Sequence, residues 1–355
     1  MNWTNDISRL LNIKYPIIQA PMFGVTSPEM VAATLNADCL GSLALADLSA
    51  DKCIEAIRAA KKLSDKHFAA NIFAHKIPEI TEDLRAQYAK TKAFIKQLAS
   101  QYNLEVEVPN IEEIKLNSYH EQIDAIIEED CKIVSFTFGN LDQQSIDKLK
   151  GKGIILIGTC TSVQEAIILE KSGIDVVCVQ GLEAGGHRGS FSSEDIPQIS
   201  GLSLLAQVRD AINVPIIYAG GIYDAKTLRA SQILGASGFQ IGSLLLASSE
   251  SMLKDFEKER LRKVKESEII LTKSFSGRFA RGIKNIFIQA TENSDYILPY
   301  PYQNKITSGL RSVARSSKNP DFVNIWVGQS INNYSGASTT EIIKKLIIDT
   351  ESSHN

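Results

Sequence analysis

The feature that most constrains the fold of this chain is an eightfold alternation of short apolar segments with segments of helical periodicity. The apolar segments have the length and composition of buried strands; they cover residues 16–20, 40–45, 68–73, 132–138, 154–158, 174–180, 214–222 and 236–243. Strands that alternate with helices indicate a parallel sheet, and eight such units close into a barrel. The sequence therefore predicts an α/β protein built on a (β/α)8 TIM barrel.

Helical patterns fill most of the gaps between these segments; they cover residues 27–36, 51–63, 120–130, 142–150, 162–172 and 224–235. The first begins with Ser27 as N-cap and Pro28 at the first helical position, where proline is favoured.

Two long stretches do not fit this repeat. Residues 77–116 form a charged, helix-prone insertion after the third strand, and residues 249–355 form a C-terminal extension. We expect residues 1–248 to form the barrel domain that contains the insertion. Active sites of such barrels lie at the carboxyl ends of the strands. We therefore expect the extension to pack on the barrel and to cover the substrate site.

Composition narrows the function classes. A chain of 355 residues with 44% hydrophobic residues can bury a large core. The net charge of −3 argues against a nucleic-acid partner. No segment approaches the roughly 20 apolar residues of a membrane span, and the N-terminus lacks a signal-peptide pattern, so we expect a cytoplasmic protein without a membrane partner. The five cysteines include no CxxC pair and indicate neither a disulfide framework nor a metal site. Oligomeric state is not indicated.

A glycine-rich loop, residues 181–189, directly follows the apolar segment that ends at Gln180. Its glycines allow the backbone to approach a ligand closely, and it contains His187 and Arg188. Histidine exchanges a proton near neutral pH, as a catalytic group must. The residues alone leave two interpretations open, an active-site loop and a solvated surface loop.

Glycine turns also follow the next two apolar segments. Gly220 and Gly221 end one strand, Gly242 ends the other, and the helical pattern 224–235 lies between them. This is the arrangement of a phosphate site after strands seven and eight of a barrel, where N–H groups and a helix N-terminus face an anion. Ser243 adds a hydroxyl. Each turn taken alone is equally consistent with an ordinary tight turn between strand and helix.

Together these segments resemble the FMN-dependent nitronate monooxygenases, formerly called 2-nitropropane dioxygenases, over nearly the whole chain. The resemblance rests on IIQAPMFG (17–24), AANIF (69–73), QGLEAGGHRG (180–189), IIYAGGI (216–222) and QIGS (240–243). Further along, it rests on SGRFARGIKN (276–285), YPYQNKITSGLR (300–311) and WVGQS (326–330).

The resemblance implies an FMN cofactor and oxidation of a nitronate, such as propionate 3-nitronate, by O2 to a carbonyl compound and nitrite without NAD(P)H. It implies that His187 is catalytic, either as a base toward a neutral nitroalkane or, when protonated, as a holder of the nitronate anion. The cofactor-binding residues that it implies are Met22 near the flavin ring, Asn71 and Gln180 as its hydrogen-bond partners, and Gly185, Gly220, Gly221, Gln240, Ile241, Gly242 and Ser243 around the ribityl chain and phosphate. Without the resemblance, Asn71 would be interpreted as a strand-end cap and Met22 as a core residue.

The chain departs from the family pattern at a few positions. Tyr218 stands where a small residue is usual, Ala225 where a glycine commonly follows Asp224, and Ser243 where threonine is usual; Asp38 and Cys39 replace a glycine pair. We expect FMN binding to tolerate these changes and Tyr218 to alter the packing beneath the phosphate.

Three alternatives stay open. Flavin-dependent enoyl-acyl-carrier-protein reductases and NADH:quinone reductases share the EAGGH, AGG and QxG segments, but the C-terminal segments and the chain length favour the nitronate enzymes. A flavin-free phosphosugar isomerase or lyase on the same barrel would be colourless. A noncatalytic flavin-binding protein would not need His187 in the ligand loop.

Overall fold

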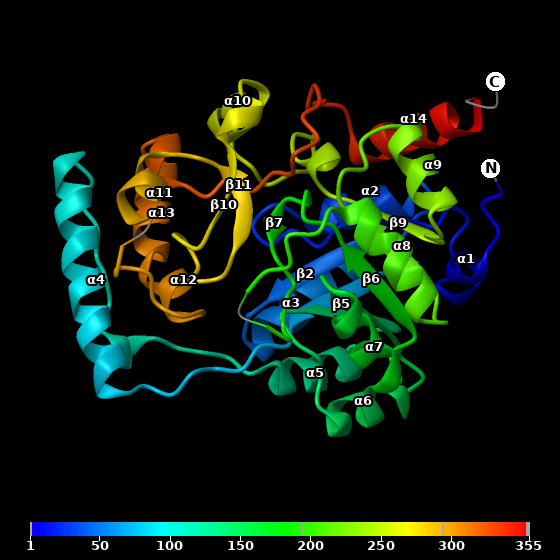
Figure 1. Ribbon diagram of the computed structural model, residues 1–355, viewed down its shortest axis with the longest axis horizontal. Helices are drawn as coiled ribbons and strands as arrows, with labels where there is room; N and C mark the ends of the chain where they lie inside the picture. The colour runs from blue at the N-terminus through cyan, green and yellow to red at the C-terminus, as the bar shows by residue number, and fades with distance from the viewer. Residues whose placement is uncertain (1, 194, 293, 353–355) are drawn as a thin grey trace.

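Eight parallel strands form a nearly closed barrel in the computed structural model, which describes residues 2–193, 195–292 and 294–352 (Figure 1). The strands are β1 (Ile17–Gln19), β2 (Ser42–Ala46), β3 (Ala69–Phe73), β4 (Ile133–Thr137), β5 (Ile155–Cys160), β6 (Val176–Gln180), β8 (Ile216–Ala219) and β9 (Gly238–Ile241). Their order is β1-β9-β8-β6-β5-β4-β3-β2, and a parallel bridge from Ile18 to Leu40 joins the two ends. The predicted (β/α)8 barrel is confirmed.

Helices cover the outside of this barrel. They are α2 (Pro28–Leu35), α3 (Ala50–Lys61), α5 (Tyr119–Glu128), α6 (Gln143–Lys150), α7 (Val163–Lys171), α8 (Gly201–Ala211) and α9 (Ala225–Ile233). Helix α1 (Asp6–Leu10) instead packs Ile7 against the core inside the barrel. Ser27 caps α2 as predicted, because its side chain accepts the Met30 N–H. No helix in the described part of the chain combines the length and apolar character needed to cross a membrane.

Helix α8 was not predicted. It begins at a glycine without a side-chain cap from its own N-cap residue, Ser200. The Gly201 N–H instead donates to the Glu183 carboxylate of the glycine-rich loop (3.0 Å). Because the cap comes from a distant residue, the local start signal for a helix is missing from the sequence.

The strands divide the core into two layers. In β6, Val177 and Val179 pack with the outer helices, whereas Val176 and Cys178 pack inside the barrel. This follows from the period of two along a strand, since both faces of a barrel strand are buried. The next inward position is Gln180, so the barrel interior becomes polar at the carboxyl ends of the strands.

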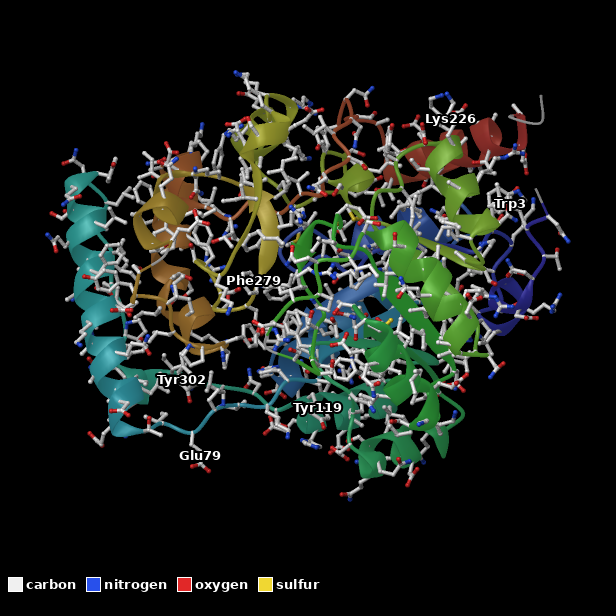
Figure 2. The ribbon with its side chains drawn as sticks, viewed as in Figure 1. Trp3, Glu79, Tyr119, Lys226, Phe279 and Tyr302 are labelled. Atoms are coloured by element: carbon white, nitrogen blue, oxygen red, sulfur yellow. The ribbon has the colours of Figure 1, made fainter. Side chains whose placement is uncertain are left out.

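The insertion and most of the extension share a second hydrophobic core beside the barrel. Its elements are α4 (Glu82–Gln101), η1 (Ile111–Glu113), α10 (Asp255–Arg262), β10 (Ile269–Thr272), β11 (Ala280–Ile283), α11 (Ile286–Thr291), α12 (Tyr302–Ile306), α13 (Ser308–Ser316) and η4 (Pro320–Phe322). The short η3 (Glu266–Glu268) precedes β10 and buries none of its residues in this core. Figure 1 shows α4 beside α11 and α13, on the side away from α9. The Phe94 ring stacks on Tyr296 at 4.2 Å, and Tyr302, labelled in Figure 2, donates to the Pro78 carbonyl (2.7 Å).

The last helix, α14 (Thr339–Ser352), returns to the barrel. Its residues Ile343 and Leu346 belong to the outer-helix core, where α14 packs on α2 and α9. The Trp3 indole donates to Glu351 (3.0 Å) and so joins the N-terminal segment to α14. Figure 1 shows α14 near the N-terminal segment, and Trp3 is labelled there in Figure 2. The described part of the extension therefore starts and ends on the barrel.

The glycine-rich loop also contains a strand. β7 (Gly186–His187) pairs antiparallel with β11, and β11 pairs with β10. A strand of two residues is too short to show a strand pattern in the sequence. β7 forms because β11 of the extension pairs with it. The pairing fixes the backbone of His187 against the extension.

We predict that Asn285→Ala destabilises the second core. Asn285 is 7% exposed, its side-chain oxygen accepts the Ile288 N–H (3.0 Å) and its amide donates to the Val323 carbonyl (2.8 Å). The substitution leaves the Ile288 N–H and the Val323 carbonyl without these partners and lowers the free energy of unfolding by about 2 kcal/mol. Urea denaturation measures this, with Asn110→Ala at the exposed start of η1 as control. An equal loss in both variants would contradict the assignment.

Candidate functional site

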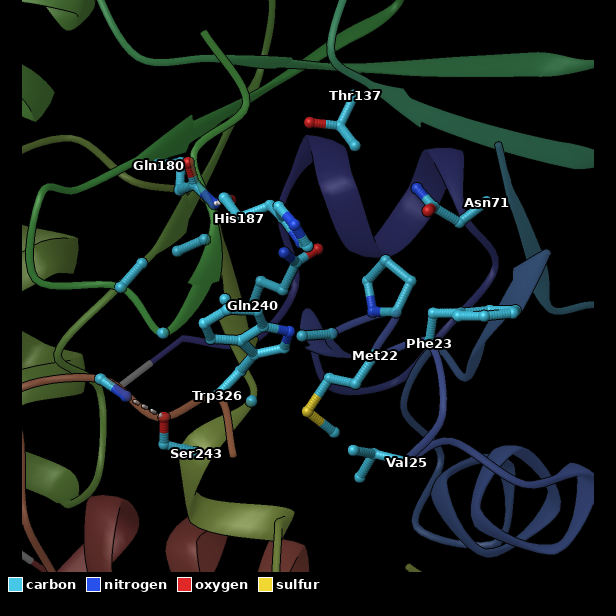
Figure 3. A pocket seen from close by; sticks show the side chains of 18 of the residues that line it. Met22, Phe23, Val25, Asn71, Thr137, Gln180, His187, Gln240, Ser243 and Trp326 are labelled. Atoms are coloured by element: carbon cyan, nitrogen blue, oxygen red, sulfur yellow. Dashed lines mark hydrogen bonds between the residues drawn. The ribbon is translucent and has the colours of Figure 1, made fainter. Parts of the chain in front are cut away.

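A cavity of about 300 Å³ lies at the carboxyl ends of the barrel strands. Figure 3 shows its labelled residues, which come from several strands and from the extension. All but one of the site residues expected from the sequence line it: Met22, Asn71, Gln180, Gly185, His187, Gly220, Gly221, Gln240, Gly242 and Ser243. The exception is Ile241, whose side chain packs in the outer-helix core.

The extension supplies the opposite wall of this cavity through Tyr300, Asn304, Arg311, Arg315, Asn324, Trp326, Gly328 and Ser330. The sequence predicts that the extension lies over the barrel, but none of these side chains was expected as a site residue. The available signal was their position in segments 300–311 and 326–330, which contributed to the family resemblance. Only the tertiary structure shows which of their side chains face the cavity.

The two glycine turns form an anion cradle from Gly220, Gly221, Gly242 and Ser243. Gly220 and Gly221 have φ values of +134° and +70°, in the region that favours glycine. Among the described residues, no backbone or side-chain acceptor pairs with the N–H groups of Gly221, Gly242 and Ser243. Unpaired N–H groups in a cavity wall are donors for a bound anion.

The expected helix N-terminus contributes little to this cradle. The first turn of α9 is already capped by Asp224, whose carboxylate accepts the Thr227 N–H (2.8 Å). After Gly242 the chain forms only one 3-10 turn, η2 (Ser243–Leu245). The donors of the cradle are therefore loop N–H groups rather than a helix end.

Segment 326–330 is held tightly against the glycine-rich loop. The Gly328 N–H donates to the Ser243 hydroxyl (2.9 Å), the contact dashed in Figure 3, and the Gln329 N–H donates to the Glu183 carbonyl (3.0 Å). A Cβ at Gly185 would lie 2.5 Å from the Gly328 nitrogen, so the approach requires glycine. The Ser243 hydroxyl keeps its own hydrogen for a ligand.

Tyr218, the departure from the family pattern, lies beneath the anion cradle. Its hydroxyl donates to the Glu183 carboxylate, which also caps α8. Burial, together with the nearby Glu183 charge, raises the pKa of Tyr218 well above its usual value, so the phenol stays a donor. A Cβ at Gly221 would lie 3.3 Å from the Glu183 side chain, which shows how closely this pair supports the turn.

The amide side chains have partners within the protein. Gln180 spans the glycine-rich loop, because it donates to the His187 carbonyl (2.9 Å) and accepts the Gly189 N–H (2.9 Å). One amide hydrogen of Gln180 is left for a ligand. Asn71 is 4% exposed and donates to the Ser135 hydroxyl (2.9 Å), which leaves its carbonyl oxygen as an acceptor in the cavity.

Arg188 follows His187 in the sequence, but its side chain binds the glycine-rich loop and does not face the cavity. Its buried guanidinium donates to the carbonyls of Gly181 (2.5 Å) and Gln180 (3.2 Å). Burial lowers the pKa of Arg188 to about 10, so the group is charged at neutral pH. It stabilises the fold of the glycine-rich loop and does not line the cavity.

The His187 ring lies between Phe138 and Trp326, with centroids 5.4 and 5.3 Å away. Its Nε2 is 2.7 Å from the Ser276 hydroxyl, which donates to the Arg278 carbonyl (3.1 Å). This network assigns the ring hydrogen to Nε2 and leaves Nδ1 as the basic nitrogen. Burial, and then the positive charges of Arg278 and Arg311, lower the pKa of His187 to about 3. The imidazole is therefore neutral at physiological pH; its Nδ1 is a hydrogen-bond acceptor, and the ring brings no positive charge of its own.

Comparison with known proteins identifies the group to which this chain is related. The sequence profile of the family described as nitronate monooxygenase matches residues 5–349. A probable nitronate monooxygenase of Staphylococcus saprophyticus is 39% identical over 355 residues, which cover 98% of each chain. One of Staphylococcus aureus is 36% identical over 329 residues, which cover 92% of this chain and 91% of the relative.

Solved structures give the same result. Nitroalkane oxidase from Streptomyces ansochromogenes superposes with a TM-score of 0.87 at 30% identity, covering 98% of both chains. FabK from Thermotoga maritima superposes with a TM-score of 0.75 at 23% identity, covering 99% of this chain and 97% of FabK; this likeness shows the fold alone. With a profile match over nearly its whole length and relatives of 36–39% identity, the chain belongs to the nitronate monooxygenase family of oxidoreductases.

Proposed function

We propose that the protein is an FMN-dependent nitronate monooxygenase that oxidises alkyl nitronates, such as propionate 3-nitronate, with O2 to carbonyl compounds and nitrite. One observation carries this proposal: the unpaired N–H donors of the anion cradle and the neutral His187 line the same cavity. Membership of the family makes this chemistry the first one to test.

The residues present fit FMN. The anion cradle suits the phosphate, because Gly221, Gly242 and Ser243 offer N–H groups without partners in the described chain. The Asn71 carbonyl and the Gln240 amide suit the polar edge of a planar ring, and Met22 offers it an apolar contact. When bound, FMN supplies the electron acceptor for the substrate.

His187 has two possible tasks toward the substrate. With a neutral nitroalkane, its free Nδ1 takes the proton of the carbon that carries the nitro group, and the bonding pair stays behind as the nitronate. With a preformed nitronate this step is unnecessary, and the neutral ring only orients the anion. Because His187 is uncharged, any cationic attraction for the nitronate comes from arginines of the extension.

The extension completes the site. We propose that segments 77–116 and 249–338 act together as a cap that separates the reacting groups from bulk water, whereas α14 only anchors the chain end on the barrel. Support comes from the shared second core and from the cavity wall that segment 300–330 provides.

The proposed function is tested by an aerobic nitrite assay with propionate 3-nitronate. We expect nitrite release that does not depend on NADH. A protein that releases no nitrite but oxidises NADH with a quinone or an enoyl thioester would instead be a reductase on the same scaffold.

We predict that the purified protein carries noncovalent FMN and that Gly242→Val weakens FMN binding about tenfold, because the side chain intrudes where backbone N–H groups face the phosphate. A Cβ at Gly242 would lie 3.3 Å from Ala20 and 3.6 Å from the Met22 sulfur, so the fold needs only small shifts. The flavin-to-protein ratio and FMN titration of the apoprotein measure this.

Gly336→Val is the matched control, since its Cβ would meet only the Arg262 side chain, at 3.5 Å. Bound FAD, a colourless protein that FMN does not reconstitute, or unchanged FMN affinity in Gly242→Val would each contradict the placement of the phosphate.

We predict that His187→Asn retains FMN and lowers kcat/KM for neutral nitroalkanes by about 10²- to 10⁴-fold. Activity on preformed nitronates falls less, because deprotonation has already occurred. Initial rates on both forms of one nitroalkane measure the difference. Equal losses on both forms would assign His187 to orientation alone, and wild-type rates would remove it from the site.

We also predict a pH signature of the neutral His187. The folded-state pKa of about 3 lies below the ordinary value of 6.5. The unfolded chain therefore binds a proton that the folded protein excludes, and the free energy of unfolding falls as the pH drops below about 6.5. His187→Asn lacks this contribution, so its stability falls less between about pH 6.5 and pH 4. Chemical denaturation across this range tests it, and parallel curves would contradict the lowered pKa.

A further inference from the structure

The cavity wall contains a guanidinium without a counter-ion. Arg311 lies on α13 and forms no ion pair with any carboxylate of the described residues. Its hydrogen bonds go to neutral oxygens, the Asn304 carbonyl (2.6 Å), the Asn304 side chain (2.9 Å) and the Thr307 carbonyl (3.3 Å). One turn along the same helix, Arg315 pairs with Glu257 (3.2 Å). A half-buried charge in the wall of a cavity, with no carboxylate in contact, is unfavourable, so the position of Arg311 requires an explanation.

The acid in the lining of this cavity does not supply the missing counter-ion. Asp47 is the acidic side chain among the described lining residues. Its charge acts on Arg311 from a distance, but its ion pair is with Lys305, at 2.7 Å. The known hydrogen bonds of Arg311 use its Nε and Nη2 groups, whereas Nη1 has only a 3.5 Å contact with the Asn324 side chain. The Nη1 group is therefore the donor with capacity for a ligand.

Tyr300 provides a second donor in the same wall. It is 7% exposed, it lines the cavity, and its buried hydroxyl has no hydrogen-bond partner among the described residues. A buried hydroxyl without a partner is unfavourable and indicates a missing acceptor. Tyr300 and Arg311 are close enough that the charge state of each affects the pKa of the other.

These donors are separated from the reacting end of the cavity by one aromatic ring. The His187 and Phe138 centroids are 5.4 Å apart, and the Phe138 and Tyr300 centroids are also 5.4 Å apart. A ligand that places its nitronate near His187 can therefore extend past Phe138 toward Tyr300 and Arg311.

We propose that Arg311 and Tyr300 form a subsite for a carboxylate at the tail of the substrate, so that the enzyme selects nitronates that carry a second anionic group. This inference rests on the proposed function and adds the specificity-determining residues. A carboxylate offers one oxygen to the Arg311 Nη1 group and the other to the Tyr300 hydroxyl. It supplies the counter-ion and the acceptor that the protein lacks. Propionate 3-nitronate has this form, whereas propyl 1-nitronate has a methyl group at the same end.

The test compares kcat/KM for these two nitronates in the wild-type holoenzyme, Arg311→Lys, Arg311→Gln and Tyr300→Phe. We expect a wild-type preference for propionate 3-nitronate, reduced about 10- to 100-fold in Arg311→Gln and mainly through KM. Arg311→Lys retains part of the preference because it keeps the charge. Arg260→Gln, which removes a positive charge from α10 outside the cavity, is the matched control and keeps the wild-type ratio.

A second measurement does not depend on turnover. Succinate has the spacing of propionate 3-nitronate with a carboxylate in place of the nitronate, and butyrate lacks the second charge. We expect succinate to perturb the flavin absorbance of the wild-type holoenzyme at about tenfold lower concentration than butyrate, and this difference disappears in Arg311→Gln and shrinks in Tyr300→Phe.

The outcomes separate the two claims. No nitrite from either nitronate would overturn the proposed function. Nitrite from both nitronates, with the same preference in the wild type and the Arg311 variants, would overturn the subsite and leave the function intact. If Arg311→Gln does not fold, because Arg311 also binds carbonyls of α12, Tyr300→Phe and the wild-type comparison of succinate with butyrate decide. Equal effects of these two ligands on the wild type would overturn the subsite.

Discussion

The contact between the extension and the glycine-rich loop is the interaction on which the site depends. On the barrel side, the Gln180 amide binds the loop. On the other side, β11 pairs with the loop, and segment 326–330 packs so closely on Gly185 that a Cβ there would lie 2.5 Å from the Gly328 nitrogen. Neither the barrel nor the extension makes the cavity alone, because each supplies one wall. The backbone of His187 is set by strand pairing, and its ring by Ser276.

The electrostatics of this cavity follow from the same arrangement. The extension brings arginines close to His187, and their charge together with burial keeps the imidazole neutral. The neutral ring of His187 and the positive charge of Arg311 are thereby separate groups of one cavity, whereas a single histidine could not be unprotonated and positively charged at the same time. At the opposite wall, the N–H groups of the anion cradle offer partial charges without a cationic side chain. This division suits an anionic substrate and an anionic cofactor group in one enclosed space.

The sequence predicted those parts of the fold whose causes are local. The strands, the Ser27 cap of α2 and the glycine turns at Gly220 and Gly242 follow from periodicity, capping and backbone freedom, and the structure has them where they were predicted. Helix α8 and β7 were missed because their partners, Glu183 for the one and β11 for the other, lie far away in sequence or in another segment. The cavity wall of the extension was missed as well, since no local pattern distinguishes Arg311, which faces the cavity unpaired, from Arg315, which is neutralised by Glu257.

In the proposed reaction, a nitronate in this cavity transfers electrons to a bound flavin without a nicotinamide donor. Its most direct test is anaerobic mixing of the holoenzyme with propionate 3-nitronate or with NADH while the flavin absorbance is recorded. We expect that the nitronate changes the oxidised flavin spectrum within the time of turnover and that NADH leaves the spectrum unchanged. Rapid flavin reduction by NADH, together with an unchanged spectrum after the nitronate is added, would contradict it.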